Sequence, residues 1–394
     1  MKQNHTGILY IGLIAAMMGY GIAMPVLPFY ITGMGGTGIH YGLLIACYGI
    51  MQLLFAPVWG SLSDAWGRKP VLLLGMAGLS AAMVLLALST ELWMLYAAQL
   101  LSGTLSSAML PASQAYISDS TSSSERAGAM GKIGGSVGIG IILGPGIGGL
   151  LASEHLSTPF FAASIFCALT CVLIFILLPE SLKPEDRHAP ESLRILQLQG
   201  LKSMLFSAAG YGLAAVFLAI LAQTMFSSIY GLYVMQRFGY GPEQVGYIMT
   251  VMAFIYALSQ GLIAGPLNRK FRETTVIPAA LFGTSVGFIM MIAAESFIAV
   301  LLSVSFFILM NSLLKPTSLS WISKHAGSSQ GKAMGIAESS MSIGRTVGPL
   351  CAGLIFDVNI FAPFIVGSAV LAAASAAMLA LRKPLTAEAW DTKD

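Results

Sequence analysis

Runs of about 20 apolar residues, separated by short polar stretches, recur along almost the whole chain. A helix of that length crosses the hydrocarbon region of a lipid bilayer. Helices are favoured there because lipid offers backbone N–H and C=O groups no partner. Twelve such segments are predicted, at residues 8–31, 41–60, 70–90, 93–117, 130–152, 159–178, 208–235, 244–266, 275–294, 297–322, 331–356 and 360–381. The pattern therefore predicts an all-α membrane protein with twelve transmembrane helices.

The longest polar interruption covers residues 179–207 and divides the chain into two parts with six predicted helices each. We interpret residues 1–178 as an N-terminal half, 179–207 as a cytoplasmic linker, and 208–394 as a C-terminal half with a short cytoplasmic tail. The two halves therefore contain the same number of predicted spans.

The two halves also share short sequence patterns at a constant offset of 204–205 residues. MLPASQAYIS (109–118) aligns with LKPTSLSWIS (314–323), and GIILGPGIGG (140–149) aligns with GRTVGPLCAG (344–353). Chance similarity between apolar segments would not keep one offset over several Gly and Pro positions. Parallel, pseudo-symmetric repeats are typical of alternating-access transporters, which bind their substrate near the bilayer midplane between the halves.

Charge is scarce and unevenly placed. The chain is 56% hydrophobic and 9% charged, with a net charge of +3 and a mean hydropathy of +0.80. Arg237 lies on one side of the twelve-helix arrangement and Lys315 and Arg345 lie inside helices, whereas the other seventeen of the 20 basic residues lie on the opposite side. The positive-inside rule then predicts a multi-pass protein of the inner (cytoplasmic) membrane with both termini cytoplasmic. Nucleic acid is not an expected partner, because the bases flank helices instead of forming a patch.

Three motifs identify a family resemblance. GSLSDAWGRKP (60–70) is similar to the signature loop between helices 2 and 3 of the major facilitator superfamily, with Ala65 at a position that is usually basic. GIILGPGIGG resembles the helix 5 motif of that superfamily's drug/proton antiporters, and LPES (178–181) matches the end of helix 6. Stretches of the first half, such as MPVLP (24–28), resemble tetracycline/proton antiporters. The second half resembles these proteins and Gram-positive multidrug exporters more weakly.

The resemblance implies two gating elements. On the cytoplasmic side it implies a latch in which Arg68 meets Asp119 and Asp64 faces helix 11. In helix 5 it implies a bend at Pro145 that helps to close the outer side against helix 8. The gating residues expected on this basis are Gly60, Asp64, Gly67, Arg68, Lys69, Asp119, Gly144, Pro145, Gly148 and Gly149. The second-half counterpart of the loop (265–272) has Arg269 in place of the aspartate, so we expect an asymmetric latch.

The chain departs from the family where proton antiporters carry charge. Ala16, Gln99, Ser227 and Ser312 stand at or near positions that are charged in the related transporters. Ionisable residues within membrane segments are costly and therefore functional candidates; here they are Lys315, Glu338 and Arg345. We expect Lys315 and Glu338 to lie at one depth and pair, with Arg345 nearer the midplane. Two hypotheses remain open: Glu338 carries the coupling proton, or transport is not coupled to protons.

A substrate site should combine aromatic and amide side chains from several helices. The candidates are Tyr20, Gln52, Gln99, Gln114, Gln223, Tyr230, Tyr233, Tyr256 and Asn311. Cys47, Cys167, Cys171 and Cys351 lie inside predicted helices without the spacing of a metal site or disulfide framework. Neither a metal nor another cofactor is expected.

The leading functional hypothesis is a monomeric efflux transporter of amphipathic, drug-like compounds, whose partners are the small-molecule substrate, the bilayer and protons. One alternative is an exporter of a specific anionic metabolite, such as a siderophore, that uses Arg345. A second alternative is a non-transporting membrane sensor on the same fold. A membrane enzyme is not expected, because no loop carries a nucleophile–base set or a metal cluster.

Overall fold

The computed structural model describes residues 3–153, 155–187, 201–326 and 330–391, and within these ranges the regular structure is helical throughout. The helices before the linker are α1 (Gln3–Ala23), α2 (Leu27–Gly33), α3 (Gly38–Trp66), α4 (Arg68–Ala87), α5 (Leu92–Ser106), α6 (Met109–Ser120), α7 (Ser123–Leu151) and α8 (Thr158–Leu177). Those after it are α9 (Leu201–Leu205), α10 (Ala208–Phe238), α11 (Pro242–Leu258), α12 (Ala264–Lys270), α13 (Glu273–Ala293), α14 (Phe297–His325), α15 (Gln330–Val358) and α16 (Ala362–Asp391). Two short elements complete the described chain: the 3-10 turn η1 (Pro184–Asp186) and the π-helix η2 (Ser259–Ile263) between α11 and α12.

Eleven of the twelve predicted segments contain a helix that is long and apolar enough to cross a membrane within the described chain. The exception is the segment 93–117, which the structure divides between α5 and α6. Pro111 accounts for the division, because its ring has no N–H and clashes with the carbonyl group four residues earlier, where the turn at Ser107–Ala108 lies. Pro316, its counterpart in the second half, leaves α14 continuous.

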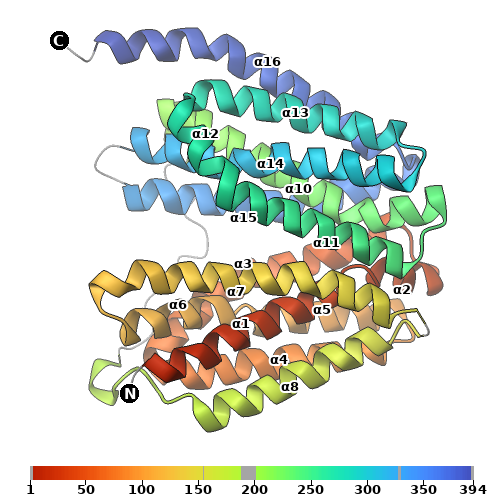
Figure 1. Ribbon diagram of the computed structural model, residues 1–394, viewed down its shortest axis with the longest axis vertical. Helices are drawn as coiled ribbons and strands as arrows, with labels where there is room; N and C mark the ends of the chain where they lie inside the picture. The colour runs from red at the N-terminus through yellow and green to blue at the C-terminus, as the bar shows by residue number, and fades with distance from the viewer. Residues whose placement is uncertain (1–2, 154, 188–200, 327–329, 392–394) are drawn as a thin grey trace. The chain divides into compact units, whose positions relative to one another are not determined.

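The chain forms two units, which we describe separately (Figure 1). Unit 1 comprises residues 1–195 and 231–253, and unit 2 comprises 196–230 and 254–394. The division lies inside the predicted linker, of which residues 188–200 fall outside the described chain. It departs from the predicted boundary at 231–253, the end of α10 and the start of α11, because these residues pack on α7.

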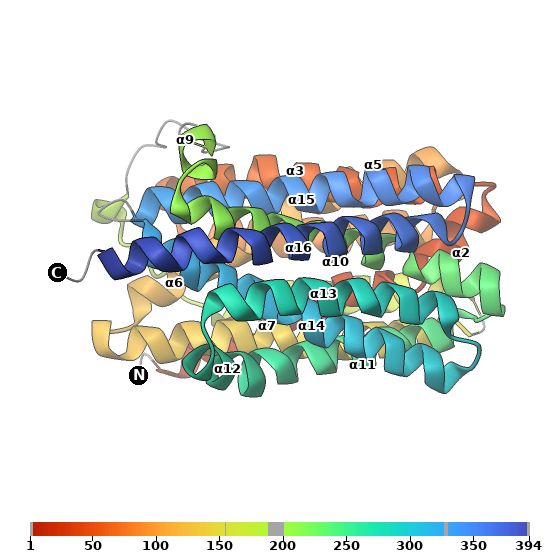
Figure 2. The same cartoon turned by 90° about the horizontal axis from the view of Figure 1, so that it is seen from above.

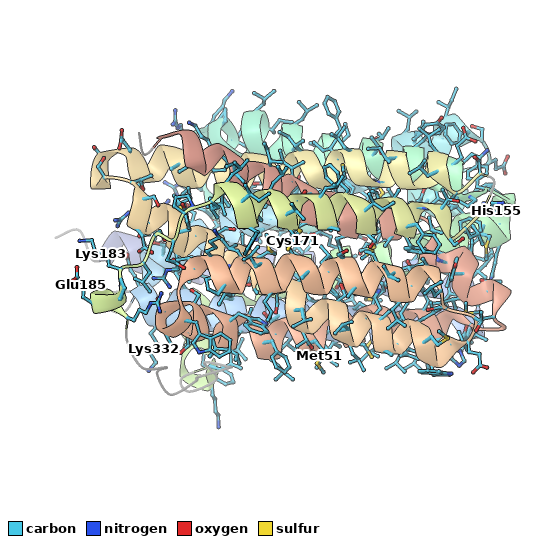
Figure 3. The ribbon with its side chains drawn as sticks, turned by 90° about the horizontal axis from the view of Figure 1, so that it is seen from below. Met51, His155, Cys171, Lys183, Glu185 and Lys332 are labelled. Atoms are coloured by element: carbon cyan, nitrogen blue, oxygen red, sulfur yellow. The ribbon has the colours of Figure 1, made fainter. Side chains whose placement is uncertain are left out.

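Unit 1 is a bundle in which α1 packs on α7 and α8, and α4 packs on α5 and α8. Figure 3 shows Lys183 and Glu185 at one end of this bundle and His155 at the other, with Cys171 of α8 between them. We call the first end, which also carries Gly67, the linker end, and the second the far end.

In unit 2, α13 packs between α14 and α16, and Figure 2 shows α13 and α16 running side by side. An apolar core joins the starts of α10 and α15 to the end of α14, through Leu213, Ile322 and Ile336 among others. As in unit 1, one end of the bundle is continuous with the linker, and we call it the linker end of unit 2.

Pairs of contacts confirm the internal repeat at the predicted offset. Ser80 of α4 and Ser164 of α8 have hydroxyl oxygens 3.0 Å apart, and those of Ser285 and Ser368, 205 and 204 positions later, are 2.9 Å apart. In the same way, Gly78 approaches the side chain of Leu105, and Gly283 approaches that of Met310. The halves therefore share helix-packing details as well as helix number.

Candidate functional site

The loop motif at the linker end of unit 1 places Arg68 at the centre of a polar cluster. Gly67 has a φ of 109°, which favours glycine, and separates α3 from α4. The Nε of Arg68 donates to Asp119 at 2.9 Å, and its Nη1 donates to the Ser63 hydroxyl at 2.8 Å and to Asp64. We call Ser63, Asp64, Arg68 and Asp119 the Arg68 cluster; it contains the Arg68–Asp119 contact that the sequence predicts.

Glu180 completes this end of the unit and was not among the predicted site residues. Its carboxylate accepts hydrogen bonds from the backbone N–H groups of Arg68 at 2.9 Å and Lys69 at 3.1 Å, the first two residues of α4. A carboxylate is favoured at a helix N-terminus, where N–H groups lack partners. Only the LPES motif, which contains Glu180, signalled this role in the sequence.

The other predicted loop residues contribute differently. Lys69 donates from Nζ to the carbonyl oxygen of Phe175 at 2.7 Å, which ties α4 to α8. A Cβ on Gly67 would collide with the Glu180 carboxylate, whereas a Cβ on Gly60 would have its nearest neighbour at 4.0 Å, in Pro111. Steric crowding therefore explains a glycine at position 67 but not at position 60.

An ion pair at the linker end of unit 2 is the counterpart of Arg68–Asp119. Lys324, next to the end of α14, donates to the carboxylate of Glu273, the first residue of α13. Both residues stand 205 positions after their counterparts, with the charges exchanged. Ser320 donates to the same carboxylate at 3.0 Å. Applying the repeat offset to Arg68 and Asp119 would have found this pair, which replaces Arg269 as the comparable feature of the second half.

The small residues of α7 face two helices. A Cβ on Gly140 would lie 2.7 Å from the carbonyl oxygen of Ile14, and one on Gly144 would lie 2.8 Å from that of Met18. Gly148 likewise meets the backbone of Ile22, so this stripe packs against α1. Such spacing lets helix backbones approach closely in lipid.

A second face of α7, at the far end, packs on α11. A Cβ on Gly149 would lie 2.5 Å from the carbonyl oxygen of Pro242, and one on Gly246 would lie 2.5 Å from that of Pro145. Beside this contact a cavity of about 400 Å³ is lined by Ser153 and Gln244, among others. The fifth predicted span (α7) thus meets the eighth (α11) through Pro145 and Gly149. The stripe that contains Gly144 and Gly148 packs on α1 instead.

The three ionisable residues inside spans of unit 2 lie near one another. Nη1 of Arg345 is 3.0 Å from Oε1 of Glu338, and Lys315 of α14 lies within electrostatic range of both. The structure therefore differs from the predicted Lys315–Glu338 pair. Seven residues on one helix make about two turns, so Glu338 and Arg345 share a face. Arg345 is 15 residues after the start of α15 and 13 before its end, at mid-helix as predicted.

Four substrate candidates are engaged in packing or in hydrogen bonds to the backbone. Tyr230 is 1% exposed and packs against Phe226 in an aromatic cluster. Tyr233, also 1% exposed, contacts Arg237 on its own helix. Asn311 donates from Nδ2 to the carbonyl oxygen of Ala219 at 3.0 Å, joining α14 to α10. These three side chains have protein partners in this structure, and Gln99, the fourth, is buried at 4% exposure. The role of all four as substrate contacts stays a prediction.

The remaining candidates keep accessible surface. Tyr20 stacks on Tyr48 with ring centroids 5.0 Å apart, and Tyr256 lies within range of the Arg345 charge. Gln52 and Gln223 are half-buried and Gln114 is exposed. Each of these five side chains stays a predicted substrate contact.

Three of the positions at which the family resemblance predicts a charge are filled by packing or by neutral hydrogen bonds. Ala16 is 1% exposed, and the Ser312 hydroxyl donates to the carbonyl oxygen of Leu309 at 2.8 Å. Ser227 donates to the carbonyl oxygen of Thr224 at 3.4 Å. Among the described residues, no group of three His, Cys, Asp or Glu side chains is placed to hold a metal ion.

Sequence comparison identifies the family. The family model described as Major Facilitator Superfamily matches residues 9–213 and 212–393. The chain belongs to the major facilitator superfamily. It is therefore a multi-pass membrane transporter and not an enzyme, as the motifs predicted.

Similar members of the superfamily include bacterial resistance proteins. Multidrug resistance protein 2 of Bacillus subtilis is 29% identical over 360 residues, covering 91% of this chain and 90% of that protein. Tetracycline resistance protein, class D, of Salmonella ordonez is 32% identical over 381 residues, covering 93% and 94%. Quinolone resistance protein NorA of Staphylococcus aureus is 27% identical over 362 residues, covering 90% and 91%.

Solved structures share the major facilitator fold. A variant of the nucleoside transporter NupG matches with a TM-score of 0.79 at 14% identity, over 97% of this chain and all of that one. The human organic anion transporter MFSD10 matches with a TM-score of 0.66 at 22% identity, over 96% and 99%. At these identities the likeness shows the fold alone.

Proposed function

We propose that this protein exports amphipathic, drug-like organic compounds, tetracycline-like ones among them, across the inner membrane of a bacterial cell. The observation that carries the proposal is the similarity to multidrug and tetracycline resistance proteins, which extends over more than 90% of the chain. Tyr20, Tyr48 and Gln52 are the side chains of unit 1 that suit such a substrate, since they offer aromatic surface with a few hydrogen-bonding groups. In this proposal the protein acts as a monomer.

Two contacts support a working transport cycle. The Arg68 cluster would stabilise the linker end of unit 1, and the Gly149–Gly246 approach would close α7 against α11 at the far end. The distribution of basic residues supports a cytoplasmic location for the linker end and both termini. The far end would then face outward, where a closed α7–α11 contact keeps substrate from leaking back.

Coupling to protons would depend on Glu338, in keeping with its position beside Arg345. The side chain of Glu338 is 56% exposed and that of Arg345 36%, so the described protein encloses neither of them fully. Protonation of Glu338 would release Arg345, since a neutral carboxyl group holds a guanidinium only weakly. Proton uptake by Glu338 and loss of its ion pair with Arg345 would in this way be linked.

Glu338→Gln is expected to lower proton-driven efflux about tenfold, which corresponds to roughly 1.4 kcal/mol, while substrate affinity changes by less than about twofold. Glutamine keeps hydrogen-bonding groups but cannot carry a proton. The measurement is substrate efflux from proteoliposomes with and without an imposed pH gradient. Glu295→Gln is the matched control, because Glu295 lies in an exposed loop of the same unit. Equal pH-driven efflux by both variants would exclude Glu338 as the proton carrier, and efflux by the unmodified protein that ignores the gradient would show that transport is not coupled to protons.

Export of an anionic metabolite is a second candidate, favoured by one observation. Lys315 and Arg345 place two positive charges near the single carboxylate of Glu338, inside spans where charge is costly. Transport in proteoliposomes distinguishes the two: an anionic substrate requires Arg345, whereas a neutral or cationic drug does not. Resistance lost on gene deletion without any change in drug accumulation would instead favour a sensor.

A further inference from the structure

An apolar groove opens on the surface of unit 2, close to its linker end. Its volume is about 380 Å³, and it is lined by side chains of α12, α13 and α14 with Ile263 and Phe271. Leu267 lies three residues before the end of α12, and Thr275 is the third residue of α13, so the groove begins near the helix ends. From there it continues to Leu309, Met310 and Leu313 of α14.

Three basic residues flank Phe271, a groove residue, in the sequence, and none of them has an acidic partner among the described residues. Arg269, Lys270 and Arg272 are exposed at the turn from α12 to α13, and none of the ion pairs among the described residues includes them. The nearest carboxylate in sequence, Glu273, is bound by Lys324. Nζ of Lys270 is 5.7 Å from the ring centroid of Phe271, and Phe271 lines the groove. Unpaired positive charge therefore meets the apolar groove at its mouth.

A π-helix shapes this part of the surface. The turn η2 separates α11 from α12, and Gln260 within it donates to the carbonyl oxygen of Ser312 on α14 at 2.8 Å. Ile263, its last residue, and Leu267, four residues later, lie on one helix face and both line the groove. Single π-helical turns are uncommon and occur often at functional sites.

Unit 1 has an apolar groove of similar size, but Arg68 and Lys69, the bases next to it in the sequence, both have protein partners. About 470 Å³ is lined by α4 and α8, including Pro70 and Phe175. The one base at its end, Lys69, is hydrogen-bonded to the carbonyl oxygen of Phe175 and lies 5.5 Å from the centroid of the Phe175 ring. Among the described residues, the groove of unit 2 therefore differs from that of unit 1 in having basic residues without ion-pair partners near it.

We propose that the groove of α12–α14 binds an anionic phospholipid, with one acyl chain in the groove and its phosphate held by Arg269, Lys270 and Arg272. The volume accommodates roughly a dozen groups of the size of a water molecule, which matches a large part of one acyl chain. Basic pockets between transmembrane helices are suited to anionic headgroups. A soluble anion would use the bases but leave the groove empty, and a neutral lipid would do the reverse.

The test is a lipid titration of the purified full-length protein in detergent, followed by native mass spectrometry. The probes are dioleoylphosphatidylglycerol and dioleoylphosphatidylcholine, which have the same acyl chains but differ in net charge. One variant, R269Q/K270Q/R272Q, removes the three charges, and a second, Ala279→Phe, fills the groove. The matched control K183Q/K202Q/K332Q removes three basic residues that lie outside the turn from α12 to α13. Thermal unfolding of each variant checks that it is folded.

The unmodified protein and the control should bind the anionic lipid with the same apparent affinity and prefer it to the neutral one. In the triple variant, the affinity for the anionic lipid should fall about fivefold for each base removed, or roughly 100-fold in all. Ala279→Phe should lose affinity for both lipids. Equal binding of the two lipids by the unmodified protein, or unchanged binding in either groove variant, would overturn the proposal.

Discussion

Replacement of Gly149 by valine is expected to lower transport about tenfold or more, because the close approach of α7 to α11 leaves no room for a side chain. A Cβ at this position would lie 2.5 Å from the carbonyl oxygen of Pro242 and 3.0 Å from the Cα of Gly246. Both neighbours are backbone atoms, which cannot turn aside as a side chain can. Overpacking of this kind costs about 1–3 kcal/mol, or about 5- to 150-fold in the population of the packed arrangement.

Gly138→Ala provides the matched control on the same helix, since a Cβ there has no neighbour within 4 Å. Efflux from proteoliposomes measures the functional effect, and membrane yield and thermal unfolding show whether each variant folds. A cysteine introduced at Ser153, beside the α7–α11 contact, should react faster with a polar thiol reagent when Gly149 is valine. If the valine variant transports like Gly138→Ala, this contact is not required in the cycle.

Much of the fold followed from the sequence because it depends on hydropathy, which is additive along the chain. The segments at 41–60 and 331–356 became α3 and α15, extended by a few residues at their ends. The break at Ser107–Ala108 could not be predicted from the sequence, because Pro111 interrupts its helix whereas Pro316 does not interrupt α14. Proline removes one hydrogen bond in both places, and the surrounding packing decides whether the helix ends.

The candidate sites were predictable to the extent that a motif specified a contact. The loop motif predicted Arg68–Asp119, and the depth of Arg345 followed from counting along an apolar segment. The rotation of each helix did not follow from the sequence, so the burial of Tyr230 and Tyr233, each 1% exposed, could not be predicted from it. The partner of Glu338 depended on side-chain reach, which the sequence pattern does not contain.

Exchanging the charges of Glu273 and Lys324 in a double variant is expected to restore most of the stability and efflux that either single change removes. Glu273→Lys places two ammonium groups together, and Lys324→Glu places two carboxylates together. Since the Glu273 side chain is 10% exposed, loss of its partner should cost about 1–3 kcal/mol. Thermal unfolding and efflux, measured for both single variants and the double variant, form a cycle that isolates the attraction between the two side chains.

Stability should recover only in part in the double variant, because the exchange places each charge at the unfavourable end of a helix. In unit 2 the acid stands at the start of α13 and the base next to the end of α14, so both agree with the helix dipoles. The exchange reverses both, at about 0.3–1 kcal/mol each. If the double variant is no more stable than the less stable of the two single variants, Glu273 and Lys324 do not attract each other measurably.

The same exchange in unit 1, Arg68→Asp with Asp119→Arg, should not restore the stability and efflux that the single changes remove. There Arg68 stands at the start of α4 and Asp119 next to the end of α6, so both oppose the dipoles. Glu180 offsets this by accepting the N–H groups of Arg68 and Lys69, and Asp64 adds a second carboxylate beside Arg68. An aspartate at position 68 would meet both of these negative charges. The halves therefore share the pair but not its surroundings, and recovery in unit 1 equal to that in unit 2 would show that Asp64 and Glu180 do not fix the polarity of the Arg68 cluster.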